Sequence, residues 1–121
     1  MPENPRTVLL VDDDPDIRDA LGSVLRDEGY VVFLAGDGQE ALEMLLTGQR
    51  PDAVILDLMM PRLNGFDFLN RLRQLGALAE VPVIVHSANR GYEADDLGVF
   101  DIVRKPAAIE HLLEALDRAA A

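Results

Sequence analysis

Carboxylates at the ends of two predicted strands are the first residues of this sequence that could do chemistry. Asp12 and Asp13 directly follow the apolar run Thr7–Val11. Asp57 directly follows a second apolar run, Ala53–Leu56. Short apolar runs without polar alternation are typical of strands buried on both faces, as in a parallel sheet between helices. An acid in this place lies at the carboxyl edge of the sheet, where open α/β proteins bind their ligands.

A hydroxyl group and an ammonium group end two later predicted strands. Ser87 follows the run Val81–His86, and Lys105 follows the run Asp101–Arg104. In a doubly wound sheet of strand order 2-1-3-4-5, the carboxyl ends of strands 1, 3, 4 and 5 lie side by side. We therefore expect three carboxylates, one hydroxyl group and one ammonium group to meet at one edge.

This set of groups is suited to phosphoryl transfer. Three neighbouring carboxylates raise one another's pKa values unless a cation joins them. Carboxylate oxygens with open positions suit Mg²⁺, which keeps several waters and completes its shell with phosphate oxygens. Lys105 would offset phosphate charge, and Ser87 would donate a hydrogen bond. Asp57 could act as a nucleophile that forms an aspartyl phosphate.

Each of these residues also has an ordinary explanation when it is considered alone. Asp14 before Pro15 is typical of a helix N-cap, and Ser87 could cap the segment that follows it. Lys105 could be a surface lysine, and the two adjacent aspartates could be a solvated pair. The functional interpretation depends on their common position at the ends of strands that the topology brings together.

Strand and helix signals alternate five times along the chain. The predicted strands are Thr7–Val11, Val31–Leu34, Asp52–Asp57, Val81–His86 and Asp101–Arg104. The predicted helices are one from Asp14 to Gly29, one from Asp37 to Gly48, one over Gly65–Leu75, a short one within Tyr92–Leu97, and one from Ile109 almost to the end. This alternation predicts an α/β, flavodoxin-like, doubly wound (βα)5 fold with a five-stranded parallel sheet of order 2-1-3-4-5.

Size and composition limit the classes of protein to consider. The 121 residues predict a single domain over 1–121, with a core of about residues 6–118 and no output domain. The sequence has no cysteine, which excludes disulfides and thiol catalysis. A formal net charge of -11 argues against direct nucleic-acid binding. Without a leader or a membrane-spanning run, we expect a cytoplasmic protein that does not insert into membranes.

Four segments together resemble the receiver domain of two-component response regulators, in the CheY-like superfamily. They are Val8–Pro15, Asp57–Gly65, Val83–Ala88 and Lys105-Pro106. The set of segments at these spacings is far more specific than any one of them. The resemblance extends from about Arg6 to the end of the chain, and it implies one receiver domain.

The resemblance implies a phosphoacceptor role for Asp57 in a phosphorelay. The phosphoryl group would come from the phosphohistidine of a histidine kinase or a histidine phosphotransfer protein. Asp13 and Asp57, with the backbone carbonyl of Met59, would hold Mg²⁺ (or Mn²⁺ in its place), and Asp12 would act through a water. Such a module catalyses only its own phosphorylation and dephosphorylation and is not otherwise an enzyme.

The resemblance also implies how the phosphoryl group is read. Lys105 would pair with the phosphoryl oxygens, and Ser87 would hydrogen-bond the phosphate and trigger a conformational shift. Met59 and Asn89 occupy the two positions at which the family tunes dephosphorylation. The expected partners include a downstream protein target, and the expected assembly is a monomer or a weak homodimer.

Two features depart from the family pattern. Family members usually carry Tyr or Phe three residues before the lysine, whereas this chain has Ile102 there. Phe100 is close by but has the wrong phase for a side chain on the same face of the strand. The segment from Ser87 to Lys105 is also roughly one helical turn shorter than usual, which predicts a shortened fourth helix. We expect intact phosphorylation chemistry with an unusual readout.

Three alternatives remain open at this point. The first is a receiver-like protein-binding module that acts without phosphorylation, which the short segment and Ile102 favour. The second is a Mg²⁺-dependent phosphatase or phosphotransferase with Asp57 as nucleophile, although Met59 stands where a second acid is usual and no cap segment is evident. The third is a flavodoxin-type flavin binder, although three acids after the first strand would repel its phosphate. A dinucleotide site is excluded because no Gly-x-Gly-x-x-Gly motif follows that strand.

Overall fold

The computed structural model describes residues 5–60, 64–88, 93–105 and 109–121 of the chain. Its strands are β1 (Thr7–Val11), β2 (Val31–Ala35), β3 (Ala53–Leu56), β4 (Val83–Ser87) and β5 (Asp101–Arg104). Its helices are α1 (Pro15–Asp27), α2 (Gly38–Leu46), α3 (Gly65–Leu72), α4 (Ala94–Leu97) and α5 (Ile109–Ala119), with a 3-10 helix η1 (Gly76–Glu80) after α3. The predicted fold class, including the shortened fourth helix, is confirmed.

The five strands form one parallel sheet in the order β2-β1-β3-β4-β5. Val11 of β1 lies opposite Leu56 of β3, so the next residue on each strand, Asp12 or Asp57, extends beyond the paired region at the same level. In the next strand pair, Ser87 of β4 lies opposite Arg104 of β5, the residue before Lys105. The register of the strands therefore brings these four residues to one edge.

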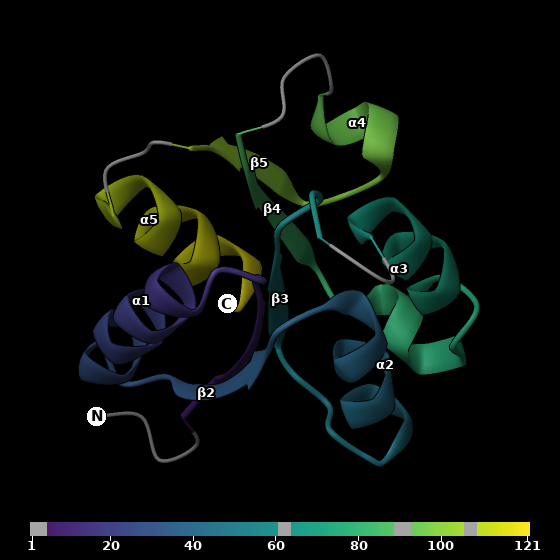
Figure 1. The fold of residues 1–121 in the computed structure, drawn as a ribbon, viewed down its shortest axis with the longest axis horizontal. Helices are drawn as coiled ribbons and strands as arrows, with labels where there is room; N and C mark the ends of the chain where they lie inside the picture. Colours follow the sequence, from purple (N-terminus) through teal and green to yellow (C-terminus); the bar gives the residue numbers. More distant parts are fainter. Residues whose placement is uncertain (1–4, 61–63, 89–92, 106–108) are drawn as a thin grey trace.

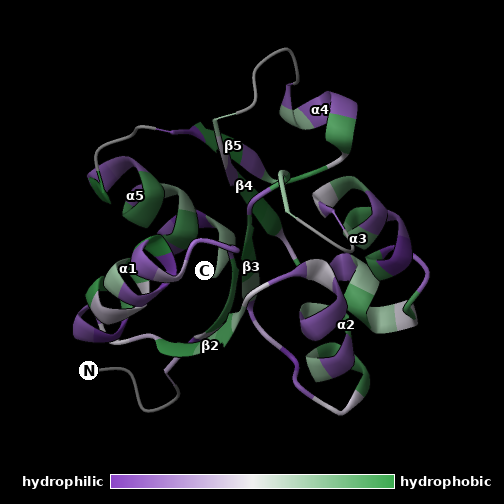
Figure 2. Ribbon diagram, viewed as in Figure 1, coloured by the Kyte–Doolittle hydropathy of each residue, from purple (hydrophilic) through white to green (hydrophobic). Residues whose placement is uncertain are grey.

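Helices cover both faces of the sheet. Figure 1 shows α1 and α5 on one face, and α2 and α3 on the other. Each face has its own buried cluster, with Leu25 and Leu116 on the α1–α5 side and Phe68 and Leu42 on the α2–α3 side. Figure 2 shows the apolar sides of these helices turned toward the sheet, as the helical spacing predicts. The central strands are buried on both faces, which explains their unbroken apolar sequences.

The structure departs from the sequence-based expectation at the end of α3 and at the start of β4. The helix predicted over Gly65–Leu75 ends at Leu72, and η1 follows it. Gly76 at the start of η1 has a φ of 61°, which a right-handed α-helix does not accommodate. Strand β4 begins at Val83 because Pro82 before it has no N–H group to donate to the sheet.

The N-terminal helix is anchored at both of its ends. The side chain of Asp14 accepts hydrogen bonds from the backbone N–H groups of Asp16 and Ile17, and Pro15 is the first helical residue. Near the other end, an Nη atom of Arg26 donates to the backbone carbonyl of Val32, 3.0 Å away, at the outer edge of the sheet.

None of the helices in the described part of the chain has the length and apolarity needed to cross a membrane.

Candidate functional site

The end of β1 presents one buried and one exposed carboxylate. Asp12 is 2% exposed, and its backbone N–H donates to the carbonyl of Ala35 at 3.1 Å. Its Oδ1 atom accepts a hydrogen bond of 3.0 Å from the backbone N–H of Asp14. Asp13, the next residue, points its carboxylate to solvent. The turn therefore places two carboxylates side by side in different environments.

The end of β3 presents a third carboxylate. Asp57 is 7% exposed, and its N–H donates to the carbonyl of Val11 at 3.0 Å, which continues the sheet pairing by one residue. Its Oδ1 atom accepts a hydrogen bond of 3.1 Å from the N–H of Met59. The start of α3 packs directly against this segment: a Cβ atom on Gly65 would lie 2.6 Å from the Cα of Leu58. A glycine is required there so that the helix can approach the backbone after Asp57.

The ammonium group of Lys105 joins the two buried carboxylates. Its Nζ atom lies 3.0 Å from Oδ2 of Asp12 and 3.3 Å from Oδ2 of Asp57. Burial alone would lower the pKa of Lys105, but the hydrogen bond to Asp12 and the charge of Asp57 outweigh it, so the pKa is raised above its ordinary value. Lys105 thus stays charged and offsets part of the repulsion between the carboxylates.

Oxygen atoms from three aspartates gather at this point. Atoms of Asp12, Asp13 and Asp57 lie within 4.8 Å of one another. Hard carboxylate oxygens at this separation suit a divalent ion such as Mg²⁺, and the open side at Asp13 leaves room for water and phosphate oxygens. The donor set therefore fits the predicted cation. The side chain of Met59, two residues after Asp57, is 62% exposed.

Ser87 lies on the neighbouring strand, next to Lys105. It is the last residue of β4 and is fully buried, and its carbonyl accepts a hydrogen bond of 3.0 Å from the N–H of Lys105. The structure thus places all of the predicted site residues at the carboxyl edge of the sheet. Asn89 and Pro106, which the sequence analysis also named, lie outside the described residues.

The family model of the response regulator receiver domain matches residues 8–117. This chain belongs to the response regulator receiver family. It is 42% identical over 113 residues to the response regulator MprA of Mycolicibacterium vanbaalenii, and the aligned region covers 90% of this chain and 48% of that protein. It is 43% identical over 110 residues to MprA of Mycobacterium ulcerans, which covers 88% of this chain and 46% of that protein. The receiver therefore spans about half the length of these relatives.

Solved receiver structures have the same fold. The chemotaxis protein CheY4 of Vibrio cholerae has a TM-score of 0.87 at 32% identity, covering 96% of this chain and 99% of that chain. TrrA of Thermotoga maritima, solved in complex with Mg²⁺-BeF, has a TM-score of 0.83 at 30% identity, covering 94% of this chain and 98% of that chain. Receivers are signalling modules of two-component systems that bind Mg²⁺ at an acidic site.

The two departures from the family pattern are both present in the structure. Ile102 on β5 is partly buried against the α2–α3 core, as are Leu97 and Val99 before it. Phe100 lies just before β5 and is 43% exposed, with the guanidinium of Arg118 5.9 Å from the centre of its ring. Phe100 therefore contacts α5 and does not replace an aromatic residue at position 102.

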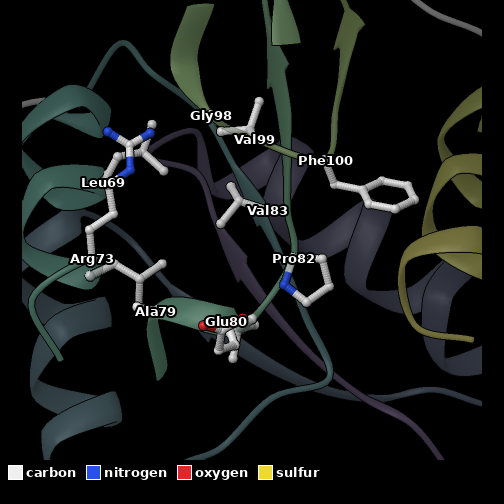
Figure 3. A pocket seen from close by; sticks show the side chains of 11 residues that line it. Leu69, Arg73, Ala79, Glu80, Pro82, Val83, Gly98, Val99 and Phe100 are labelled. Atoms are coloured by element: carbon white, nitrogen blue, oxygen red, sulfur yellow. The ribbon is translucent and has the colours of Figure 1, made fainter. Parts of the chain in front are cut away.

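The receiver also has a hollow at the opposite edge of the sheet. Its volume is about 290 Å³, and its walls come from α3, η1, the start of β4 and the segment Gly98–Phe100 (Figure 3). Arg73 and Glu80 stand on its walls, and the ring of Phe100 points away from it toward α5. None of the predicted site residues lines this hollow, so the chemistry belongs to the acidic edge and not to this hollow.

Sequence reasoning missed one residue at the acidic edge. Arg18 on α1 donates from Nη1 to the backbone carbonyl of Asp12 at a distance of 3.0 Å. The only signal was its position one helical turn after the cap residue Asp14, from which a long side chain can reach back along the helix. Spacing alone does not distinguish such a residue from a solvated arginine.

The stability of the receiver is expected to depend on pH through His86. Burial and then the charge of Lys105 lower the pKa of His86, although Asp12 and Asp57 oppose this effect. Among the described residues its Nδ1 atom is buried without a hydrogen-bond partner. The unfolded chain therefore takes up a proton that the folded chain does not, and stability is lost as the pH falls below about 6.5. Each tenfold difference in the proton affinity of His86 between the unfolded and folded chains lowers the free energy of unfolding at acidic pH by about 1.4 kcal/mol.

This pH dependence can be checked by urea unfolding at about pH 7.5 and about pH 5.5. In His86→Gln, the loss of stability between these two values should be smaller than in the wild type. The exposed His111 on α5 supplies the control, since His111→Gln should leave the loss unchanged. Equal losses in the wild type and in His86→Gln would show that His86 does not contribute.

Proposed function

We propose that this receiver accepts a phosphoryl group on Asp57 from the phosphohistidine of a histidine kinase or a histidine phosphotransfer protein. The observation that supports it most is the position of Lys105, whose ammonium group contacts both Asp57 and Asp12 beside the third carboxylate. A structural ion pair needs one carboxylate for one ammonium group. Three carboxylates around one ammonium group leave a local negative charge that a divalent cation would balance.

The oxygen atoms at this edge have distinct proposed roles toward the cation. Asp13 and Asp57, with the backbone carbonyl of Met59, would hold Mg²⁺, and Asp12 would act through a water. When bound, Mg²⁺ neutralises charge on the oxygens of the transferring phosphoryl group. Mn²⁺ has the same preference for carboxylate oxygens and could replace it.

The side chains of the receiver supply the remaining steps. An oxygen of Asp57 attacks phosphorus in line with the leaving nitrogen, so a P–O bond forms as the P–N bond breaks and the imidazole takes up a proton. Lys105 moves its hydrogen bond from the free carboxylate to the phosphoryl oxygens. Ser87 then donates a hydrogen bond to the phosphate, and this new contact favours a second conformation of the receiver.

The signal would pass to a downstream protein and not directly to nucleic acid, because the acidic surface repels phosphate backbones. We further propose a cytoplasmic location and a monomer or weak homodimer. A second candidate is a receiver that binds its partner without phosphorylation. The single-turn α4 and the aliphatic Ile102 favour it, because both lie where a phosphate-linked shift would be read.

Intact mass after incubation with acetyl phosphate and Mg²⁺ tests the proposal. The wild type should gain one phosphoryl group, about 80 Da. Asp57→Asn should gain none, and the wild type with EDTA should gain none. Asp67→Asn, which changes an exposed aspartate on α3, should behave as the wild type does. Failure of the wild type to react with acetyl phosphate and with a phosphorylated histidine kinase would instead favour the phosphorylation-independent module.

A further inference from the structure

The exposed carboxylate of Asp13 lacks a side-chain contact that would hold it in place. In the described part of the chain, its carboxylate makes no hydrogen bond or ion pair, whereas Asp12 and Asp57 each accept one from a backbone N–H and from Lys105. Its direction is therefore set by the backbone on either side of it. One of these restraints is the hydrogen bond from the N–H of Asp14 to Asp12.

The other restraint comes from Arg18. Its Nη1 atom donates to the carbonyl oxygen of Asp12 at 3.0 Å, and this carbonyl belongs to the same planar peptide group as the N–H of Asp13. Fixing the carbonyl fixes the plane of that peptide, and with it the direction in which the Asp13 side chain leaves the backbone. The N–H of Asp12 is already held by Ala35, so the carbonyl is the next group along the chain that could rotate.

The end of β2 leaves space for this arginine. Gly36 follows β2 directly, and a Cβ atom at this position would lie 3.0 Å from Nη1 of Arg18. The same Nη1 atom is the donor to Asp12. A larger residue at position 36 would therefore push the guanidinium away from the carbonyl that it holds.

We propose that Arg18 is a positioning residue that orients Asp13 toward the cation, and that Gly36 provides the space it needs. This inference rests on the Mg²⁺ site of the proposed function. Residues that orient metal ligands typically contribute about 10-fold to 100-fold to metal affinity. Because Asp13 is one ligand among several oxygens and waters, we expect Arg18→Ala to weaken Mg²⁺ binding by about 5-fold to 10-fold.

The chain offers a closely matched control for Arg18. Arg26 lies on the same helix and also donates to a backbone carbonyl at 3.0 Å, but that carbonyl belongs to Val32 at the outer edge of the sheet. Arg26→Ala should lower the urea midpoint to a similar extent and leave the Mg²⁺ dissociation constant within about 2-fold of the wild type. Arg18→Lys keeps a charge and a donor and should recover part of the affinity, and Gly36→Ala should weaken binding less than Arg18→Ala does.

The experiment measures the Mg²⁺ dissociation constant by calorimetry for these variants, together with hydrogen exchange of the Asp14 amide, which donates to Asp12, in the metal-free protein. Faster exchange of the Asp14 amide in Arg18→Ala but not in Arg26→Ala would support the positioning role, because release of the Asp12 carbonyl would loosen the turn that this amide closes. Unchanged or tighter Mg²⁺ binding in Arg18→Ala would overturn it, since tighter binding would mean that the charge of Arg18 only repels the cation. Wild-type protein that binds no Mg²⁺ would overturn the proposed metal site, and this inference with it.

Discussion

Gly65→Ala is expected to lower the free energy of unfolding by about 3 kcal/mol and to slow phosphorylation of Asp57. The added Cβ would lie 2.6 Å from the Cα of Leu58 and 2.9 Å from the carbonyl oxygen of Asp57. Both of these atoms belong to the backbone, so the new methyl group cannot be accommodated by rotation of a side chain. Either α3 moves away from the sheet or the segment after Asp57 moves, and the second change displaces the phosphoacceptor.

Urea unfolding measures the first effect, and the rate of mass gain with acetyl phosphate measures the second. Gly22→Ala on α1 is the control, because a Cβ there would meet side-chain atoms and no backbone, the nearest being a methyl group of Leu34 at 3.1 Å. The helical alanine also gains up to about 1 kcal/mol in helix propensity, so this variant should stay within about 1 kcal/mol of the wild type. If Gly65→Ala were as stable as Gly22→Ala, the close approach of α3 to Leu58 would be wrong.

Lys105→Met is expected to cost about 2 kcal/mol of stability in metal-free buffer. The substitution keeps the length of the side chain but leaves Asp12 and Asp57 without the ammonium group that both contact. Two nearly buried carboxylates would then repel each other with no cation between them. The cost is less than for a fully buried pair because the Lys105 side chain keeps 18% of its surface exposed.

Urea unfolding with and without millimolar Mg²⁺ tests this prediction. If the cation binds among the same carboxylates, it should stabilise Lys105→Met more than it stabilises the wild type. Arg104→Gln is the control, since this neighbouring residue is partly exposed and forms an ion pair of 3.9 Å with the exposed Glu93, and pairs of this kind contribute at most about 1 kcal/mol. Equal stability of Lys105→Met and the wild type without metal would show that the three groups do not interact in solution as the structure indicates.

The arrangement of strands and the gathering of the site residues could be predicted from the sequence. Parallel strands that are buried on both faces have unbroken apolar sequences. Asp12 and Asp57 are the first polar residues after two such strands and therefore indicate where these strands end. The alternation with helices then restricts the topology to very few choices. Because a strand order determines which ends are neighbours, Ser87 and Lys105 could be assigned to the same edge before any distance was known.

The contacts that refine the site could not be predicted, because they depend on distances between separate elements. No local pattern indicates that Arg18 reaches the carbonyl of Asp12, or that α3 packs so closely on Leu58 that a Cβ on Gly65 would lie 2.6 Å from its Cα. Helical spacing likewise identified the apolar side of α1 but not its width, and Ile17 on that side is 36% exposed. The 3-10 helix after α3 was also missed, since its start depends on the positive φ of Gly76.

The presence of lysine and not arginine at position 105 has a practical consequence for chemical labelling. The sequence contains 11 lysine and arginine residues, and Lys105 is its one lysine. A reagent for primary amines therefore has a single side-chain target in this sequence, and that target is the group bound to Asp12 and Asp57. Its raised pKa keeps the amine protonated and slow to react. The labelling rate of one residue thus becomes a direct reporter of whether the carboxylates still hold the ammonium group, in a chain without tryptophan to serve as an optical probe.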